Sequence, residues 1–285
     1  ITWNFCKAFD MKFNGKRFCL LHLENDRPPK NWLKAFKPYD YAFNVSPHAY
    51  FQAIKWGFPK EKMINISPNG IDKDIFNTNV MPLNIHPKLF KFLTVGATQP
   101  RKGTDRLIKA YFEEFTSKDN VILIIKDYMY GWKDWTLKMI KEAKQGKKNP
   151  PRIEYIFDDW PTEKLASLYR AVAINGAMFH PHKGECFGLP IIEFLACGGR
   201  VGTTNYTGPK YLLKDIANSY PNQVHLFDYK MRLSTFHNWI EEPYYEKGEN
   251  PMWALANIND CRKWAREVYE TRYSKEDSQK VSNEI

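Results

Sequence analysis

The sequence of 285 residues lacks an apolar run long enough to span a membrane, since its longest, Val121–Ile125, has five residues. It begins with Ile, and no signal peptide follows, so we expect a fragment or a processed product. Cysteines are few, widely spaced and without a C-x-x-C pair: Cys6, Cys19, Cys186, Cys197 and Cys261. This pattern indicates neither a disulfide framework nor a zinc site. It predicts a reducing compartment, and we expect a cytoplasmic protein.

Signals of disorder and low complexity are also missing. The chain has nine Trp, sixteen Tyr and nineteen Phe, and 43% of its residues are hydrophobic, as in a globular protein with substantial cores. Lys and Arg number 42 against 32 Asp and Glu, which gives a net charge of +10. This excess favours an anionic partner such as a phosphate, a nucleic acid or an acidic membrane surface. A solvated basic face is the alternative explanation of the same count.

Short β-rich runs alternate with helical stretches along the chain. Strands separated by helices of about ten residues or more imply right-handed crossovers and a parallel, doubly wound α/β sheet. From about Met231 the pattern becomes aromatic and helical, and Ile258–Tyr273 has the pattern of an amphipathic helix. We expect strands at 17–23, 41–45, 62–67, 92–96, 121–126, 153–157, 175–180 and 200–204, and helices at 47–57, 104–115, 133–145, 161–171 and 189–197.

The sharpest local signal combines two carboxylates with the start of a helix. Glu185 lies in a loop after a predicted strand, and Glu193 lies about one turn inside the helix that Gly188 opens. Free N–H groups at a helix N-terminus bind anions, and such sites lie beyond the carboxyl ends of parallel strands. The neighbours of Glu193 are apolar, so its carboxylate needs a partner such as a ligand hydroxyl. By spacing alone, a surface helix residue at Glu193 and a loop charge at Glu185 are the favoured explanation, and it is the apolar neighbours that shift the balance.

A second signal is a loop with two adjacent basic residues. Arg101, Lys102 and Gly103 directly follow the strand expected at 92–96. A basic pair beside a glycine, which lets a backbone approach closely, suits a diphosphate. The loop is not a G-x-x-x-x-G-K-[ST] phosphate loop, and the sequence contains no G-x-G-x-x-G. By itself the loop is equally consistent with an ordinary basic surface turn.

Taken together, these segments resemble family 4 of the retaining glycosyltransferases, which have the GT-B fold. The spacing of Glu185 and Glu193 resembles the family's E-x7-E motif, and the following Ala-Cys-Gly-Gly-Arg-Val-Gly-Thr-Thr resembles its ACG-x-PV strand entry. The match runs in order over roughly residues 17–215. Its other parts are the strand, loop and helix of 92–115, the segment 159–171, Val45-Ser46 and Ser67-Pro-Asn-Gly-Ile-Asp72.

The resemblance implies two Rossmann-like domains that face a cleft. We expect an incomplete N-terminal, acceptor-side domain over 1–80 and a nucleotide-sugar-binding domain over 81–240. We expect helices in 241–285 to pack back toward the N-terminal domain. The implied activity is retaining, hexosyltransferase-type transfer from a nucleoside-diphosphate sugar to an acceptor hydroxyl, in polysaccharide or glycolipid biosynthesis. The acceptor itself stays open among a saccharide, a lipid and a protein. No metal and no other cofactor is expected, and nucleic acid is not an expected partner, whereas peripheral contact with an anionic membrane is compatible with the charge.

The resemblance also implies roles for individual residues at the diphosphate. Arg101 and Lys102, beside Gly103, would neutralise the leaving diphosphate, which is a task of divalent metals in other enzymes. The backbone N–H groups of Phe187, Gly188 and Leu189 would complete the cradle around it.

Three further roles concern the sugars. Glu193 would bind the ribose hydroxyls, and Glu185 would bind the hydroxyls of the donor sugar. His22, at the end of the strand expected at 17–23, matches the family's cleft histidine and would contact the donor sugar at the reacting face. A strand-end histidine with its own hydrogen-bond partner is the alternative for His22.

The sequence departs from the family pattern in two places. Gly96-Ala97 stands where the family has an Arg after the glycine of the strand, and the glycine-rich loop after the first N-terminal strand is missing. A second interpretation is therefore a non-catalytic nucleotide-sugar or anion-binding module with a degenerate site. A third is a nucleic-acid or membrane-surface binder driven by the net charge, whose binding would fall steeply with salt.

Two patterns resemble metal sites but are disfavoured. Asp72-Lys-Asp74 is literally D-x-D, yet it lies in the segment between the predicted domains instead of at a strand end. His180 and His182 with Glu185 do not have the spacing of helical zinc ligands.

Overall fold

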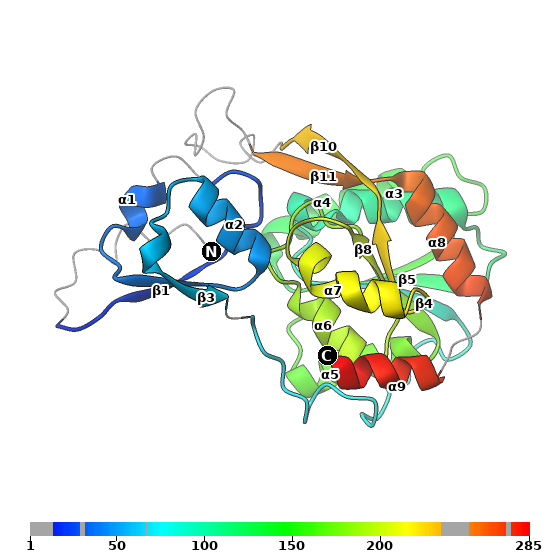
Figure 1. Ribbon diagram of the computed structural model, residues 1–285. Coiled ribbons are helices and arrows are strands. Elements are labelled where there is room, and N and C mark those ends of the chain that lie inside the picture. Colours follow the sequence, from blue (N-terminus) through cyan, green and yellow to red (C-terminus); the bar gives the residue numbers. More distant parts are fainter. Residues whose placement is uncertain (1–13, 29–31, 67, 235–250, 272–274) are drawn as a thin grey trace.

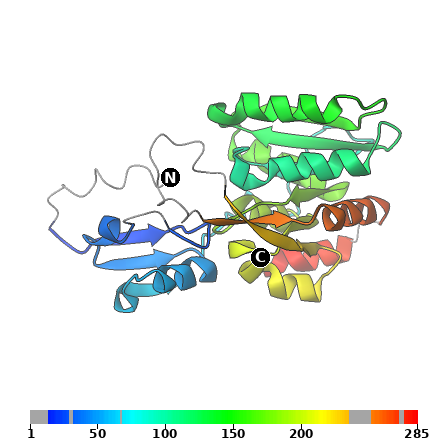
Figure 2. The ribbon, with the colours of Figure 1, turned by 90° about the horizontal axis from the view of Figure 1, so that it is seen from above.

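The computed structural model describes residues 14–28, 32–66, 68–234, 251–271 and 275–285. These residues form a small unit on a three-stranded sheet and a larger unit on a six-stranded sheet (Figure 1). A two-stranded hairpin belongs to neither sheet, and Figure 2 shows it extending from the larger unit toward the small one. The arrangement therefore has two α/β sheets, as the alternating sequence pattern predicts.

The small unit holds three parallel strands in the order β1-β2-β3. Its α2 starts where the sequence predicts, because Ser46 Oγ accepts a hydrogen bond from the Ala49 N–H at 3.3 Å and Pro47 fits the first turn. The three expected strands and the helix at 47–57 are confirmed with slightly shorter bounds. The elements are β1 Phe18–Leu21, α1 Trp32–Phe36, β2 Tyr41–Asn44, α2 Pro47–Lys55, a 3-10 turn over Lys60–Lys62 and β3 Met63–Ile66.

The larger sheet is parallel throughout, in the order β6-β5-β4-β7-β8-β9. Every residue of β5 is buried, as its continuous apolar run predicts for a strand covered on both faces. The direction in which strands are added reverses between β4 and β7, and open α/β sheets bind ligands at such a point. The strands are β4 Phe90–Val95, β5 Val121–Asp127, β6 Arg152–Phe157, β7 Gly176–His180, β8 Val201–Thr204 and β9 Val224–Phe227.

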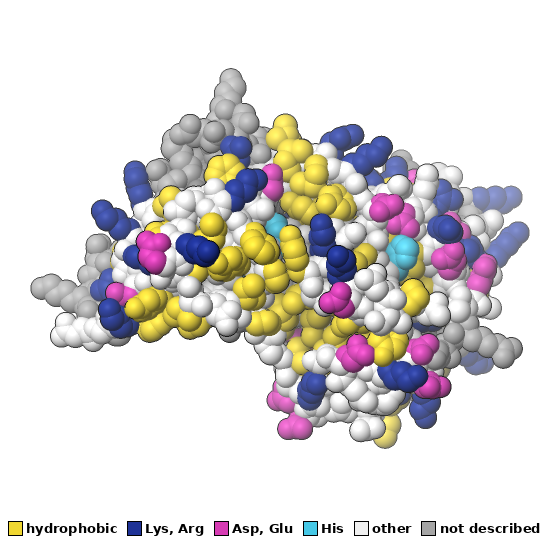
Figure 3. All heavy atoms as spheres, in the orientation of Figure 1, with side chains coloured by type: hydrophobic (Ala, Val, Ile, Leu, Met, Phe, Trp, Pro, Cys, Tyr) yellow, Lys and Arg dark blue, Asp and Glu magenta, His cyan; other side chains and the backbone are white. Residues whose placement is uncertain are grey.

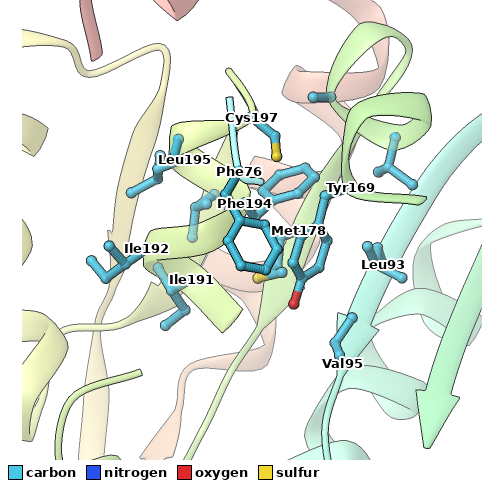
Figure 4. Packing of buried hydrophobic residues seen from close by; sticks show 14 of the residues in the cluster. Phe76, Leu93, Val95, Tyr169, Met178, Ile191, Ile192, Phe194, Leu195 and Cys197 are labelled. Atoms are coloured by element: carbon cyan, nitrogen blue, oxygen red, sulfur yellow. The ribbon is translucent and has the colours of Figure 1, made fainter. Parts of the chain in front are cut away.

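Helices cover both faces of this sheet, and side chains that alternate along the strands feed two separate cores. Leu93 packs with Tyr169 and Phe194 in the core of Figure 4, whereas its neighbour Phe92 packs with Trp264 in the opposite one. The doubly wound architecture is therefore confirmed. The helices are α3 Thr104–Glu114, α4 Lys133–Lys144, α5 Thr162–Ile174, α6 Leu189–Ala196, α7 Thr207–Ser219, α8 Ile258–Glu270 and α9 Lys275–Glu284, with 3-10 turns at Pro100–Lys102 and Tyr130–Trp132.

The helical pattern expected from Met231 onward is wrong at its start. β10, Tyr229–Leu233, pairs antiparallel with β11, Met252–Ala256. Apolar and charged residues alternate along β10, which is the period of a strand with one covered face. The residues 235–250 between the two strands lie outside the described part of the chain.

The helices after residue 241 lie against the larger unit. α8 packs on α3, and α9 packs on α6, where Ser282 Oγ donates a hydrogen bond to the Ala196 carbonyl at 2.6 Å. Among the described residues, β11 contacts the small unit through Met252 and Trp253, and Gln279 of α9 accepts a hydrogen bond from Thr78, which also lies within 1–80. The domain bounds at 80/81 and 240/241 remain a prediction.

The described residues also bear on the compositional expectations. Their four cysteines, Cys19, Cys186, Cys197 and Cys261, are buried and unpaired. None of the described helices is long and apolar enough to cross a membrane. On the face seen in Figure 3, Lys and Arg side chains are spread over both units among Asp and Glu. This face therefore does not show the concentrated basic surface of a nucleic-acid binder.

Candidate active site

The candidate site lies at the carboxyl ends of β4 and β7, where the strand order reverses. The loop after β4 carries Arg101, Lys102 and Gly103, and the loop after β7 leads through Glu185 to α6. Gly103 has φ +71°, and a Cβ there would lie 2.0 Å from the Pro181 carbonyl oxygen. Glycine therefore lets the two loops pack backbone to backbone, and the Lys183 N–H donates to the Arg101 carbonyl at 2.7 Å.

The basic pair converges on Glu185. Lys102 Nζ and Glu185 Oε2 form an ion pair, and Arg101 Nη1 lies 3.5 Å from the same oxygen. The Glu185 side chain is only 9% exposed, and burial acts to raise its pKa. Lys102 and Arg101 outweigh that effect and hold the pKa of Glu185 well below its usual value. Glu185 is therefore an ionised carboxylate inside the fold.

The start of α7 fixes the backbone of Glu185. Its N–H donates to Thr207 Oγ1 at 2.9 Å, and its carbonyl accepts from the Gly208 N–H at 2.9 Å. A Cβ on Gly208 would lie 2.0 Å from the Cys186 carbonyl oxygen, so the two segments are in close contact. Sequence reasoning missed this contact. The start of α7 has no local pattern that predicts a hydrogen bond between Thr207 and Glu185, which lies 22 positions earlier.

Two buried histidines lie near this ion pair: His180 ends β7, and His182 is in the loop that follows. His180 Nδ1 lies 3.1 Å from Thr94 Oγ1, and its Nε2 lies 3.9 Å from Glu185 Oε2. Burial lowers the pKa of His180, and burial together with His180 lowers the pKa of His182 well below its usual value. Both imidazoles are therefore neutral at pH 7. Among the described residues, no group of three or more His, Cys, Asp and Glu is arranged to hold a metal ion.

The deeper carboxylate, Glu193, has a different environment. It is half-buried on α6, and Tyr169 donates a hydrogen bond from its hydroxyl to Glu193 Oε2 at 3.1 Å. Burial raises the pKa of Glu193, and the Tyr169 hydrogen bond partly opposes the rise. The partner that sequence reasoning expected from a ligand hydroxyl is thus provided, in this structure, by a tyrosine hydroxyl of α5.

The N-terminus of α6 lies between the two carboxylates. Gly188 has φ +93° at the N-cap position, and Pro190 stands in the first turn. Phe187 is buried, whereas Leu189 is 37% exposed. Pro190 has no N–H, and Ile191 and Ile192 donate theirs to the Gly188 carbonyl, so an anion at this helix start would meet the N–H groups of Leu189 and of the loop before it.

His22 follows β1 directly, and its side chain is exposed. The contact between this segment and the site is made two residues later, where Glu24 Oε2 lies 2.8 Å from Arg101 Nε. The structure therefore brings Arg101, Lys102 and Glu185 together with Glu24, which sequence reasoning did not single out. A glutamate after a short strand has no local pattern that predicts its partner.

Comparison with known proteins places the chain in a family. The model of the glycosyl transferases group 1 family matches residues 77–226, which is 150 of the 285 residues. The chain therefore belongs to this family. A search of curated proteins found no match.

Solved structures with a similar fold are GT-B glycosyltransferases. Sucrose-phosphate synthase from Thermosynechococcus elongatus has a TM-score of 0.61 at 16% identity, over 96% of this chain and 64% of that one. Anabaena HepE in complex with UDP has 0.61 at 15%, over 94% and 68%. WaaG, a glycosyltransferase involved in lipopolysaccharide biosynthesis, has 0.55 at 15%, over 87% and 57%. The fold is thus GT-B, and the chain spans between 57% and 68% of the length of these three proteins.

Proposed function

We propose that this protein is a retaining, metal-independent glycosyltransferase that moves a sugar from a nucleoside-diphosphate sugar to an acceptor hydroxyl. The observation that carries the proposal is the buried, ionised Glu185 held by Lys102 and Arg101 where β4 and β7 end. This arrangement places fixed positive charge and a carboxylate acceptor side by side. A leaving diphosphate needs the first, and sugar hydroxyls need the second.

The leaving diphosphate binds to Arg101 and Lys102 and to the backbone N–H groups of Phe187, Gly188 and Leu189. As the bond from the anomeric carbon to the diphosphate breaks, negative charge grows on the phosphate oxygens, and these preorganised donors stabilise it. The acceptor oxygen forms its bond to the same face of that carbon, and its proton passes to the departing diphosphate. In this proposal the cations of the chain do the work of a divalent metal, so a chelator leaves the rate unchanged.

The two carboxylates divide the recognition of the donor. Glu185 accepts hydrogen bonds from the hydroxyls of the transferred hexose, and Glu193 accepts them from the ribose hydroxyls. His22 contacts the donor sugar from the small unit. These interactions position the reacting carbon, which is the main task of the protein when no covalent intermediate is formed.

For the acceptor, we propose a saccharide or glycolipid. The family membership and the likeness to WaaG support this class, and the net charge of +10 supports peripheral contact with an anionic membrane. Vesicles with and without anionic lipid test the membrane contact, since electrostatic binding falls as salt rises.

A thermal-shift screen against UDP, GDP, ADP and their sugar conjugates tests the donor site. A ligand at a hundred times its dissociation constant stabilises the fold by about 2.7 kcal/mol. We expect one nucleotide family to stabilise the wild type and to have little effect on Glu193→Ala. NMR then determines the anomeric configuration of the product, which tests whether the transfer is retaining. Nucleotide binding without transfer or donor hydrolysis would favour the non-catalytic module instead.

A further inference from the structure

The small unit reaches the candidate site through Glu24. Its carboxylate lies 2.8 Å from Arg101 Nε, and its backbone carbonyl lies so close to Gly184 that a Cβ there would come within 2.1 Å. Arg101 also donates to the Gly184 carbonyl through Nη1 at 2.5 Å. Glu24 therefore occupies the guanidinium that the proposed mechanism assigns to the diphosphate.

The next two residues hold this segment in place. Asn25 Oδ1 accepts a hydrogen bond from Trp253 Nε1 at 3.1 Å, and Asp26 Oδ1 accepts one from the Met252 N–H at 2.7 Å. The backbone beside Glu24 is thus anchored on β11, which belongs to a different part of the chain. A movement of the Glu24 side chain does not require these anchors to break.

The charges at the site cancel. Arg101 and Lys102 supply two positive charges, and Glu24 and Glu185 supply two negative ones. An added diphosphate brings further negative charge into a neutral cluster, so its binding is favoured if one carboxylate leaves. Glu185 is 9% exposed and faces both cations, whereas Glu24 is 34% exposed. Glu24 is the carboxylate that can turn toward water at the smaller cost.

We propose that Glu24 is an internal competitor for the diphosphate of the donor, pairing with Arg101 in the ligand-free protein and turning into solvent when the diphosphate binds. This inference rests on the proposed function, in which Arg101 binds that group. It makes Glu24 a specificity-determining residue. A ligand gains from Arg101 only if it carries enough negative charge to replace a carboxylate, so the site discriminates against nucleosides.

The test is isothermal titration of the whole chain with inorganic pyrophosphate, UDP and uridine. In Glu24→Gln the side chain keeps its shape but loses its charge, and we expect pyrophosphate and UDP to bind about tenfold more tightly, the size of one charge-assisted hydrogen bond. Uridine binding is expected to stay unchanged. Asp26→Asn is the matched control, because it removes the same charge two residues away and keeps an oxygen that accepts from the Met252 N–H.

The outcomes separate the two proposals. Equal or weaker pyrophosphate binding by Glu24→Gln, in a wild type that does bind it, overturns the role of Glu24. The same tightening in Asp26→Asn also overturns it, because the effect would then be general charge. If neither the wild type nor Glu24→Gln binds pyrophosphate or UDP, or if Arg101→Gln binds them as the wild type does, the proposed diphosphate site itself fails. Thermal unfolding of each variant verifies that it is folded.

Discussion

Glu185 and Glu193 stand at the two ends of one segment, but their carboxyl groups lie in opposite electrostatic environments. In the loop before α6, Lys102 and Arg101 from the loop after β4 hold the pKa of Glu185 low. One helical turn into α6, burial raises the pKa of Glu193, and a tyrosine hydroxyl is its neutral partner. The difference shows that motif spacing fixes the position of two carboxylates, whereas their charge states depend on what other elements bring to them.

Removing the Lys102 cation, which pairs with Glu185, should have the largest effect. We expect Lys102→Ala to reduce turnover roughly 10²–10³-fold, since one key electrostatic contact to the leaving group is lost. It should also lower the free energy of unfolding by roughly 3 kcal/mol, because Glu185 stays buried with one partner fewer. Steady-state kinetics and urea unfolding measure the two effects. Lys109→Ala, which breaks the exposed pair with Glu113, is the control, and an equal loss there would remove the special role of Lys102.

The candidate site also depends on the close approach of the loops that follow β4 and β7. Gly103→Ala should lower the free energy of unfolding by roughly 2–4 kcal/mol, because the methyl group would clash with the Pro181 carbonyl in a left-handed backbone. Gly146→Ala provides a matched control, since its φ of +74° is nearly the same but its Cβ would have nothing within 4 Å. The difference between the variants in chemical denaturation isolates the clash. Similar losses would show that only the backbone conformation matters.

The opposite pKa shifts predict opposite pH dependences. Because the folded pKa of Glu185 is depressed, its contribution to stability is present above the unfolded value, about pH 4, and is lost as pH falls through the folded pKa. For Glu193, whose folded pKa is raised, the contribution is complete below about pH 4 and is lost as pH rises through the folded pKa. Unfolding free energies from pH 3 to 7 for Glu185→Gln and Glu193→Gln should differ from the wild type with opposite slopes. Slopes of the same sign would contradict the comparison.

Loss of the Tyr169 hydroxyl should have the smallest effect. Tyr169→Phe removes one hydrogen bond from Glu193, so we expect the free energy of unfolding to fall by about 1 kcal/mol and the pKa of Glu193 to rise further. NMR titration of the labelled glutamate carboxyl reports the pKa. Tyr211→Phe on the exposed surface is the control for loss of a hydroxyl. An unchanged Glu193 pKa would show that the hydroxyl does not set its charge state.

The regular part of the fold could be predicted from the sequence because its signals are local. The continuous apolar run of β5 and the proline after Ser46 each fix an element from a few neighbouring residues. β9 and α7 were missed although they are equally regular. The hairpin was mistaken for helix, since the partner of β10 lies beyond residues 235–250 and no local period identifies it.

The site could be predicted in part for the same reason. Arg101, Lys102 and Glu185 each follow a predicted parallel strand, so their place at the carboxyl edge of the sheet follows from the pattern, whereas the structure shows that β4 and β7 are neighbours there. Glu24 and Thr207 come from elements whose packing the pattern does not specify. Their roles depend on tertiary contacts, and these are visible only once the chain is folded.

The contact between Asp26 and Met252 has a consequence for the order of folding. It joins residues 226 positions apart, so the chain must close a very long loop before the small unit can make this contact. Neighbouring βα segments of the larger sheet close much shorter loops and should form earlier. During synthesis, the segment that carries Glu24 leaves the ribosome well before β11, so its contact with the hairpin waits until that strand has been made.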